Sequence, residues 1–85
     1  MLELDGRGLA HPEPLEKSVA MFETLESGGV LHLRIHRLPV PLLQIAEGRG
    51  LRYAVHEAGE GDFHILFTRD ADVDLRSVLR ERADV

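Results

Sequence analysis

The sequence predicts an α/β (α+β) fold, a two-layer sandwich whose elements follow the order β-α-β-α-β-β in one domain. Three observations predict it. Four short segments alternate apolar and polar residues, as half-buried strands do. Two segments between them repeat apolar residues at helical spacing, and glycine or proline separates each segment from the next. Because crossovers between parallel strands are right-handed, two helices are expected on one sheet face, with the other face open.

The chain begins with a predicted strand and a turn. Residues 1–5 alternate, with Leu2 and Leu4 on one side and acidic residues on the other. Gly6 and Gly8 then supply positions where a positive φ is easily adopted. The strand is therefore expected to end before Gly6, and the chain to reverse into the first helix.

The first helix is predicted to open at two prolines and to end near Glu26. Pro12 and Pro14 suit the first turn of a helix, where a missing N–H leaves no hydrogen bond unmade. Ser27-Gly28-Gly29 follows the last apolar position and stops the helix. The apolar positions recur at spacings of four, three and three residues: Leu15, Val19, Phe22 and Leu25.

A second strand and a shorter helix follow. Residues 30–36 alternate without interruption and predict the strand. Its core-facing residues are Leu31, Leu33 and Ile35, and those of the opposite face are His32, Arg34 and His36. The rigid segment Leu38-Pro39-Val40-Pro41 then leads into a helix that is expected to end at Gly48 or Gly50.

The last two strands are predicted as a hairpin over residues 51–57 and 63–67. A three-residue loop, Gly59-Glu60-Gly61, with Gly61 in the left-handed region keeps every apolar residue of both strands on one side. This register predicts four cross-strand pairs: Tyr53 with Phe67, Val55 with Ile65, His56 with His64, and Ala58 with Asp62.

The end of the chain is more polar, and we divide the sequence into a domain of residues 1–69 and a C-terminal extension of residues 70–85. The extension is interpreted as a short helix capped by Asp72, or as a loose tail. In a helix, one apolar edge would form from Leu75, Val78 and Leu79. This edge, or the open sheet face, can pair two copies of the chain in a homo-oligomer.

The composition excludes several classes of function. Without cysteine, the chain cannot form disulfides, carry a persulfide, use a thiol nucleophile or bind zinc through thiolates. The formal net charge of −5 argues against a nucleic-acid partner, since an acidic protein repels phosphate backbones. No signal peptide or membrane span is predicted, because the longest apolar run covers only residues 38–43 and contains two prolines. We therefore expect a cytoplasmic protein without a membrane partner.

The segment Leu4-Asp5-x-Arg7-Gly8-Leu9-x-x-Pro12-x-Pro14 resembles the signature at the start of TusA/SirA-like proteins, in which Cys-Pro-x-Pro opens the first helix. This resemblance implies a mixed four-stranded sheet of order 1-2-4-3, with the fourth strand antiparallel to the others. Sulfurtransferases of that family carry sulfur on the cysteine as a persulfide, and here the position is His11. The resemblance therefore implies the fold and not the sulfur-relay activity.

Two further segments resemble a branch of that family that lacks the cysteine. They are Leu38-Pro39-Val40-Pro41-Leu42 and Gly50-Leu51-x-Tyr53-x-Val55. The members of this branch are prokaryotic and form a domain of unknown function. The resemblance therefore supplies no activity, substrate or cofactor, and the function has to be argued from the residues.

The turn around the missing cysteine is the first candidate site for a ligand or partner, and it comprises Arg7, His11, Pro12, Glu13 and Pro14. A helix N-terminus carries partial positive charge, so a histidine there is expected to stay neutral. Neutral imidazole can ligate a metal ion, accept a proton or accept a hydrogen bond. The simpler interpretation is that His11 caps the helix or merely replaces the cysteine, and that Glu13 complements the helix dipole.

The histidines of the open sheet face are the second candidate site. His56 and His64, if opposite, have Cβ atoms about 5 Å apart and can hold a divalent metal ion. If the fourth strand lies beside the second, His64 also approaches His32 or His36. Those two are about 13 Å apart along their own strand and cannot share an ion. The alternatives are a solvated polar face, or a contact surface whose binding weakens on protonation.

Three functions remain open from the sequence. The favoured one is a small cytoplasmic, non-enzymatic module that binds a partner protein or a small ligand through the His11 turn and the open sheet face. The second is a metal- or cofactor-binding protein that uses His11 or the His56/His64 pair. The third is an enzyme with His11 as general base, for which only Glu13 or Arg7 can be named as a second group.

Overall fold

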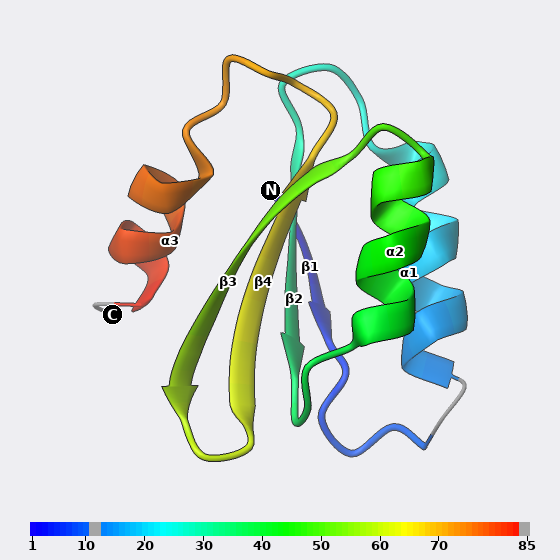
Figure 1. Cartoon of the computed structure of the whole chain (residues 1–85), viewed down its shortest axis with the longest axis vertical. Helices are drawn as coiled ribbons and strands as arrows, with labels where there is room; N and C mark the ends of the chain where they lie inside the picture. The colour runs from blue at the N-terminus through cyan, green and yellow to red at the C-terminus, as the bar shows by residue number, and fades with distance from the viewer. Residues whose placement is uncertain (11–12, 84–85) are drawn as a thin grey trace.

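The computed structural model describes residues 1–10 and 13–83, and its elements confirm the predicted fold (Figure 1). The strands are β1 (Leu2–Asp5), β2 (Val30–Ile35), β3 (Arg52–Gly59) and β4 (Asp62–Thr68), and the helices are α1 (Glu13–Thr24), α2 (Val40–Gly48) and α3 (Leu75–Ala83). The sheet order is β1-β2-β4-β3, with β1 parallel to β2 and β4 antiparallel to both neighbours, as the resemblance implied. No helix in the described ranges is long and apolar enough to cross a membrane.

The main core lies between one face of the sheet and the helix pair α1 and α2, as predicted (Figure 1). Leu31 and Leu33 of β2 are fully buried there, together with Ile65 and Phe67 of β4. Phe22 of α1 packs on Phe67, with the ring centroids 4.9 Å apart. This packing determines the register of the strands, because a slip of one residue would turn every one of these apolar side chains to the opposite face.

Helix α1 ends at Thr24, slightly before the predicted Glu26. Its last carbonyl groups bind a side chain from a distant part of the chain. Arg69, which directly follows β4, donates from Nη2 to the carbonyl oxygen of Phe22 at 2.6 Å and from Nε to that of Leu25 at 3.2 Å. The arginine thereby supplies donors to carbonyl groups at the end of the helix, where Phe22 otherwise accepts a long bond of 3.3 Å from the N–H of Leu25.

The hairpin between β3 and β4 confirms three of the four predicted pairs and corrects the fourth. The confirmed pairs are Tyr53 with Phe67, Val55 with Ile65, and His56 with His64. Asp62 pairs with Gly59 instead of Ala58, because a β-bulge between Glu57 and Gly59 takes up one residue of β3. The loop is therefore shorter than predicted, although Gly61 does have the predicted left-handed conformation, with φ of 70°.

The C-terminal segment forms helix α3 on the sheet face opposite α1 and α2 (Figure 1), so the prediction that this face is open was wrong for part of it. Leu75 and Leu79 are 3% and 9% exposed, and they pack with Val30 and Leu66 in a second, smaller core. Val30 and Leu66 are apolar residues on a largely polar sheet face, and α3 removes them from water. The edge that was predicted to pair two copies is thus largely buried within one chain.

Helix α3 is capped by Asp74, and the predicted cap, Asp72, lies in the preceding turn. The Asp74 carboxylate accepts bonds from the hydroxyl group of Ser77 at 2.8 Å and from its backbone N–H at 3.3 Å. These bonds lower the pKa of Asp74. The segment before the helix is held by Arg52 of β3, whose Nη1 donates to the carbonyl oxygens of residues 70, 71 and 73.

Candidate functional site

A pocket of about 500 Å³ lies where the turn after β1 meets the connection from β2 to α2. Its lining is mostly apolar, and two of its side chains, His36 and Arg37, can carry positive charge. The other lining residues are Leu9, Ala10, Pro14, Leu15, Ile35, Leu38, Pro39, Pro41 and Leu42. Concave apolar sites with a few polar groups are typical of ligand binding, so this pocket is the first candidate site.

Glycine at position 6 brings the two walls of the pocket together. Gly6 is buried, and its N–H donates to the carbonyl oxygen of Arg34 at 2.7 Å. A Cβ atom at this position would lie 3.4 Å from that oxygen and 3.4 Å from Pro14 Cβ. Gly8, with φ of 85°, then turns the chain towards α1. The glycines predicted for this turn therefore place β1, β2 and the start of α1 in contact.

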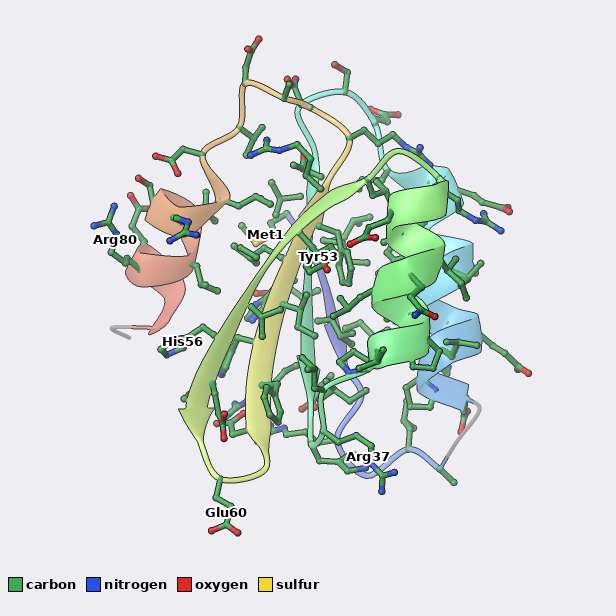
Figure 2. The ribbon with its side chains drawn as sticks, in the orientation of Figure 1. Met1, Arg37, Tyr53, His56, Glu60 and Arg80 are labelled. Atoms are coloured by element: carbon green, nitrogen blue, oxygen red, sulfur yellow. The ribbon has the colours of Figure 1, made fainter. Side chains whose placement is uncertain are left out.

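The connection from β2 to α2 forms an exposed apolar rim at the pocket. Leu38 lines the pocket and is 44% exposed, whereas Val40 is 49% exposed and does not line it. Pro39 stands at the N-cap of α2 and Pro41 in its first turn, which restricts the backbone of the rim. Figure 2 shows Arg37 at the start of this connection, with its side chain projecting out of the molecule.

The structure separates the residues that the sequence placed together in a site at the turn before α1. Arg7 is bound to Asp5 through Nε at 3.0 Å and Nη2 at 2.9 Å, and these bonds lower the pKa of Asp5 to about 2. Pro14 is buried and lines the pocket, whereas Glu13 is exposed at the first residue of α1. Two of the predicted residues lie outside the described residues: His11 and Pro12.

Five polar side chains are connected on the sheet face that α3 covers only in part, and we call them the histidine cluster. His32 Nε2 and His64 Nδ1 are 2.9 Å apart, which makes a hydrogen bond between two imidazole rings. His32 Nδ1 is 3.5 Å from Glu3 Oε1, and His64 Nε2 is 3.5 Å from Asp62 Oδ1. Arg34 donates to the two carboxylate oxygens of Asp62 at 2.8 and 2.7 Å. The cluster thus links three strands, β1, β2 and β4.

The predicted His56/His64 pair is formed, but it is not the closest pair of histidines. The ring centroids of His56 and His64 are 6.4 Å apart, against 5.1 Å for His32 and His64. His64 lies opposite Arg34 in the sheet, so His32 is its diagonal neighbour on the same face. In the described parts of the chain, no three His, Cys, Asp or Glu side chains are arranged to hold a metal ion. The metal alternative therefore gains no support from these residues.

The position of His64 in the cluster predicts a loss of stability in acid. Burial is the main cause that lowers the pKa of His64, the Asp62 carboxylate opposes this effect, and His32 adds to it. In the unfolded chain this histidine has a pKa of about 6.5, so it binds its proton more tightly than His64 does in the native state. Below that pH the unfolded state holds more protons than the native state, so the free energy of unfolding decreases as the pH is lowered.

We expect the substitution His64→Gln to flatten this decrease between about pH 7 and about pH 5, as measured by urea unfolding at a series of pH values. Asp62 does not contribute to the slope in this range, because the bonds from Arg34 hold its pKa at about 2. Equal slopes for the original chain and the variant would contradict the prediction.

The family model that matches the chain is described as "Uncharacterized conserved protein (DUF2249)", and the match covers residues 3–69. The chain belongs to the DUF2249 family. No curated protein matches the sequence of this DUF2249 protein.

Among solved structures, the DUF2249 protein is similar to the crystal structure of a SirA-like protein from Desulfitobacterium hafniense, with a TM-score of 0.70. The sequence identity is 21%, and the similarity covers 79% of the DUF2249 chain and 95% of the SirA-like chain. At this identity the likeness shows the fold. The predicted likeness to the SirA-like fold is confirmed, in a DUF2249 chain that itself contains no cysteine.

Proposed function

We propose that this DUF2249 protein is a small, non-enzymatic binding module whose pocket beside the turn after β1 receives an apolar group of a partner protein or a small ligand. The observation that carries the proposal is the pocket of about 500 Å³, with its apolar walls and the exposed apolar rim next to it. Removing apolar surface of this kind from water lowers the free energy, so it favours binding of a ligand that covers the surface. Because the chain has no cysteine, the proposal includes no sulfur transfer.

The basic side chains of the lining favour a ligand in which an acidic group stands next to the apolar one. Arg37 and His36 are exposed neighbours at the end of β2. Among the described residues, Arg37 has no hydrogen-bond or ion-pair partner. A guanidinium group binds a carboxylate through two parallel bonds, so Arg37 is suited to hold the acidic group of such a ligand.

Naphthoate is a suitable probe, because it joins an apolar ring system to one carboxylate. We expect its binding to shift the backbone amide resonances of Leu9, Leu15 and Arg37 in two-dimensional NMR spectra. The substitution Leu38→Glu, which places a negative charge at the rim, is expected to raise the dissociation constant at least about tenfold. Naphthalene methanol lacks the carboxylate, and we expect it to bind the original chain more weakly than naphthoate does. On the variant Arg37→Gln, we expect the two probes to bind with equal affinity.

Val40→Glu is the matched control, because Val40 is as exposed as Leu38 and lies two residues away without lining the pocket. It adds the same charge and is expected to leave the dissociation constant within about twofold of the original value. The proposal would be contradicted if the two variants weakened naphthoate equally, or if the shifted resonances lay away from the pocket.

A further inference from the structure

The hydrogen bond between His32 and His64 is a feature that the proposed binding function does not use. It lies on the sheet face opposite the main core, whereas the pocket lies beside α1 and α2. Both imidazole side chains are only 13% exposed, so little water is available to replace the bond. Each ring has a carboxylate beyond it, Glu3 for His32 and Asp62 for His64.

The facing nitrogens of the two rings lie within hydrogen-bond distance of each other. The facing nitrogens, His32 Nε2 and His64 Nδ1, are 2.9 Å apart, while the ring centroids are 5.1 Å apart. The planes of the rings differ by 22°. The rings therefore lie almost end to end, with the lone pair of one nitrogen directed at the other nitrogen. A short contact of this kind is stable only when one of the two nitrogens carries hydrogen and the other does not.

The number of protons on the two rings determines how many of the three contacts are satisfied. Two neutral rings hold two N–H groups, so one nitrogen with a lone pair faces either the carboxylate of Glu3 or that of Asp62. Two charged rings hold four N–H groups, and two of these collide between His32 and His64. One added proton gives three N–H groups for three contacts. His32 then donates to His64 and directs its other N–H at Glu3, and His64 directs its second N–H at Asp62.

We propose that His32 and His64 form a site for a single proton, which the two imidazole rings take up between them and Glu3 and Asp62 hold from either end. A second proton is excluded for as long as the sheet is intact. Acidification therefore adds one positive charge to this face of the sheet, where two separate histidines would add two. The bound proton also connects β1, β2 and β4 through side chains, in addition to the backbone ladder.

The groups around the pair are consistent with one proton. The two imidazole rings are faced by Glu3 of β1 and by Asp62 of β4. Arg34 of β2 also lies nearby, and Asp62 compensates its charge. On β3 the neighbouring group is His56, whose ring centroid is 6.4 Å from that of His64. A proton on His56 would repel a second proton on the pair.

Helix α3 packs against the same face with an apolar surface. It contributes Leu75 and Leu79 to the second core, and Val78 packs beside them. Its charged residues Arg76 and Arg80 line a hollow next to β3, where Figure 2 shows Arg80 on the outer side of the helix. The helix therefore adds apolar bulk to this face of the sheet, and the carboxylates next to the two rings come from the strands.

The test is an NMR titration of the full chain labelled with ¹⁵N at histidine. Near neutral pH, we expect a resolved coupling between His32 Nε2 and His64 Nδ1 across the hydrogen bond. Between about pH 8 and about pH 5, the ¹⁵N shifts of the two rings together should report the uptake of one proton. The variant His56→Gln is the control, because its ring is outside the hydrogen-bonded chain, and we expect it to keep the coupling.

Three results would overturn the proposal. One is the absence of the coupling near neutral pH, which does not depend on the stability of the fold in acid. Another is the appearance of two doubly protonated rings while the amide spectrum stays that of the folded chain. The third is the loss of the coupling on addition of one equivalent of zinc, with saturable shifts at His32 and His64, which would assign the pair to a metal ion.

Discussion

The substitution Leu75→Ala is expected to lower the free energy of unfolding by about 2–5 kcal/mol, although it lies in a segment that the sequence allows to be a loose tail. The physical reason is that Leu75 is 3% exposed and fills the contact of α3 with Val30 and Leu66. Truncation to alanine removes apolar contacts and leaves a cavity that the short helix can close only in part. Urea unfolding followed by circular dichroism measures the effect.

The control for this prediction is Arg76→Ala, one residue further along the same helix and exposed. Alanine favours helix formation slightly more than arginine, and we expect a change within about 0.5 kcal/mol. An effect of Leu75→Ala as small as that of the control would show that α3 does not contribute to the fold. The polar sheet face would then be open along its whole length, as the sequence predicted.

The substitution Arg69→Ala is expected to lower the free energy of unfolding by about 1–3 kcal/mol. Arg69 donates charge-assisted hydrogen bonds to the carbonyl oxygens of Phe22 and Leu25, at 2.6 and 3.2 Å. Its removal leaves the last carbonyl groups of α1 without these donors, and it separates the end of β4 from the helix. Thermal unfolding followed at the helix signal measures the change, which should appear as a lower melting temperature of the whole domain.

Two variants distinguish this bond from a general loss of positive charge. Arg49→Ala removes an exposed contact of 3.4 Å with Glu23 and is expected to cost less than about 0.5 kcal/mol. Arg69→Lys keeps the charge but lacks the forked guanidinium group that reaches both carbonyl oxygens. We therefore expect it to lower the free energy of unfolding by less than Arg69→Ala does and by more than Arg49→Ala does. If Arg69→Ala were no more destabilising than Arg49→Ala, the cap would not contribute to stability.

The two sites of this protein lie on opposite faces of the sheet and suggest different chemistry. The pocket combines apolar walls with Arg37, and it lies next to the turn that follows β1. The histidine cluster is polar, partly covered by α3, and connected from Glu3 to Asp62. Naphthoate binding and proton uptake can therefore be measured independently.

The alternation of the strands was enough to predict most of the fold. In β2, Leu31 and Leu33 face the helices, and His32 faces the other side, as the period of two residues requires. The same period, together with the glycines of the hairpin, predicted three pairs between β3 and β4. The fourth pair was wrong because the bulge near Ala58 leaves no signal in an alternating pattern.

The candidate sites were predicted less completely, because they depend on residues that are distant in the sequence. The β1 turn was found from its glycines and prolines, but the pocket exists only where that turn meets Leu38 and Arg37. The pair of His56 and His64 followed from the hairpin, whereas the contact of His32 with His64 depends on β4 lying beside β2.

The sequence by itself determined the four strands and the first two helices, the face of most strand residues, and the exclusion of cysteine chemistry. These follow from the spacing of residues along the chain and from composition. The sequence left the C-terminal segment open and was wrong for His36, which follows β2 and lines the pocket. The tertiary structure decided that α3 covers Val30 and Leu66, that Arg69 caps α1, and that two histidines share a hydrogen bond. The reason is that local spacing specifies which way a side chain points, whereas its partner is specified by the order of the strands and by the apolar surface that the other elements leave exposed.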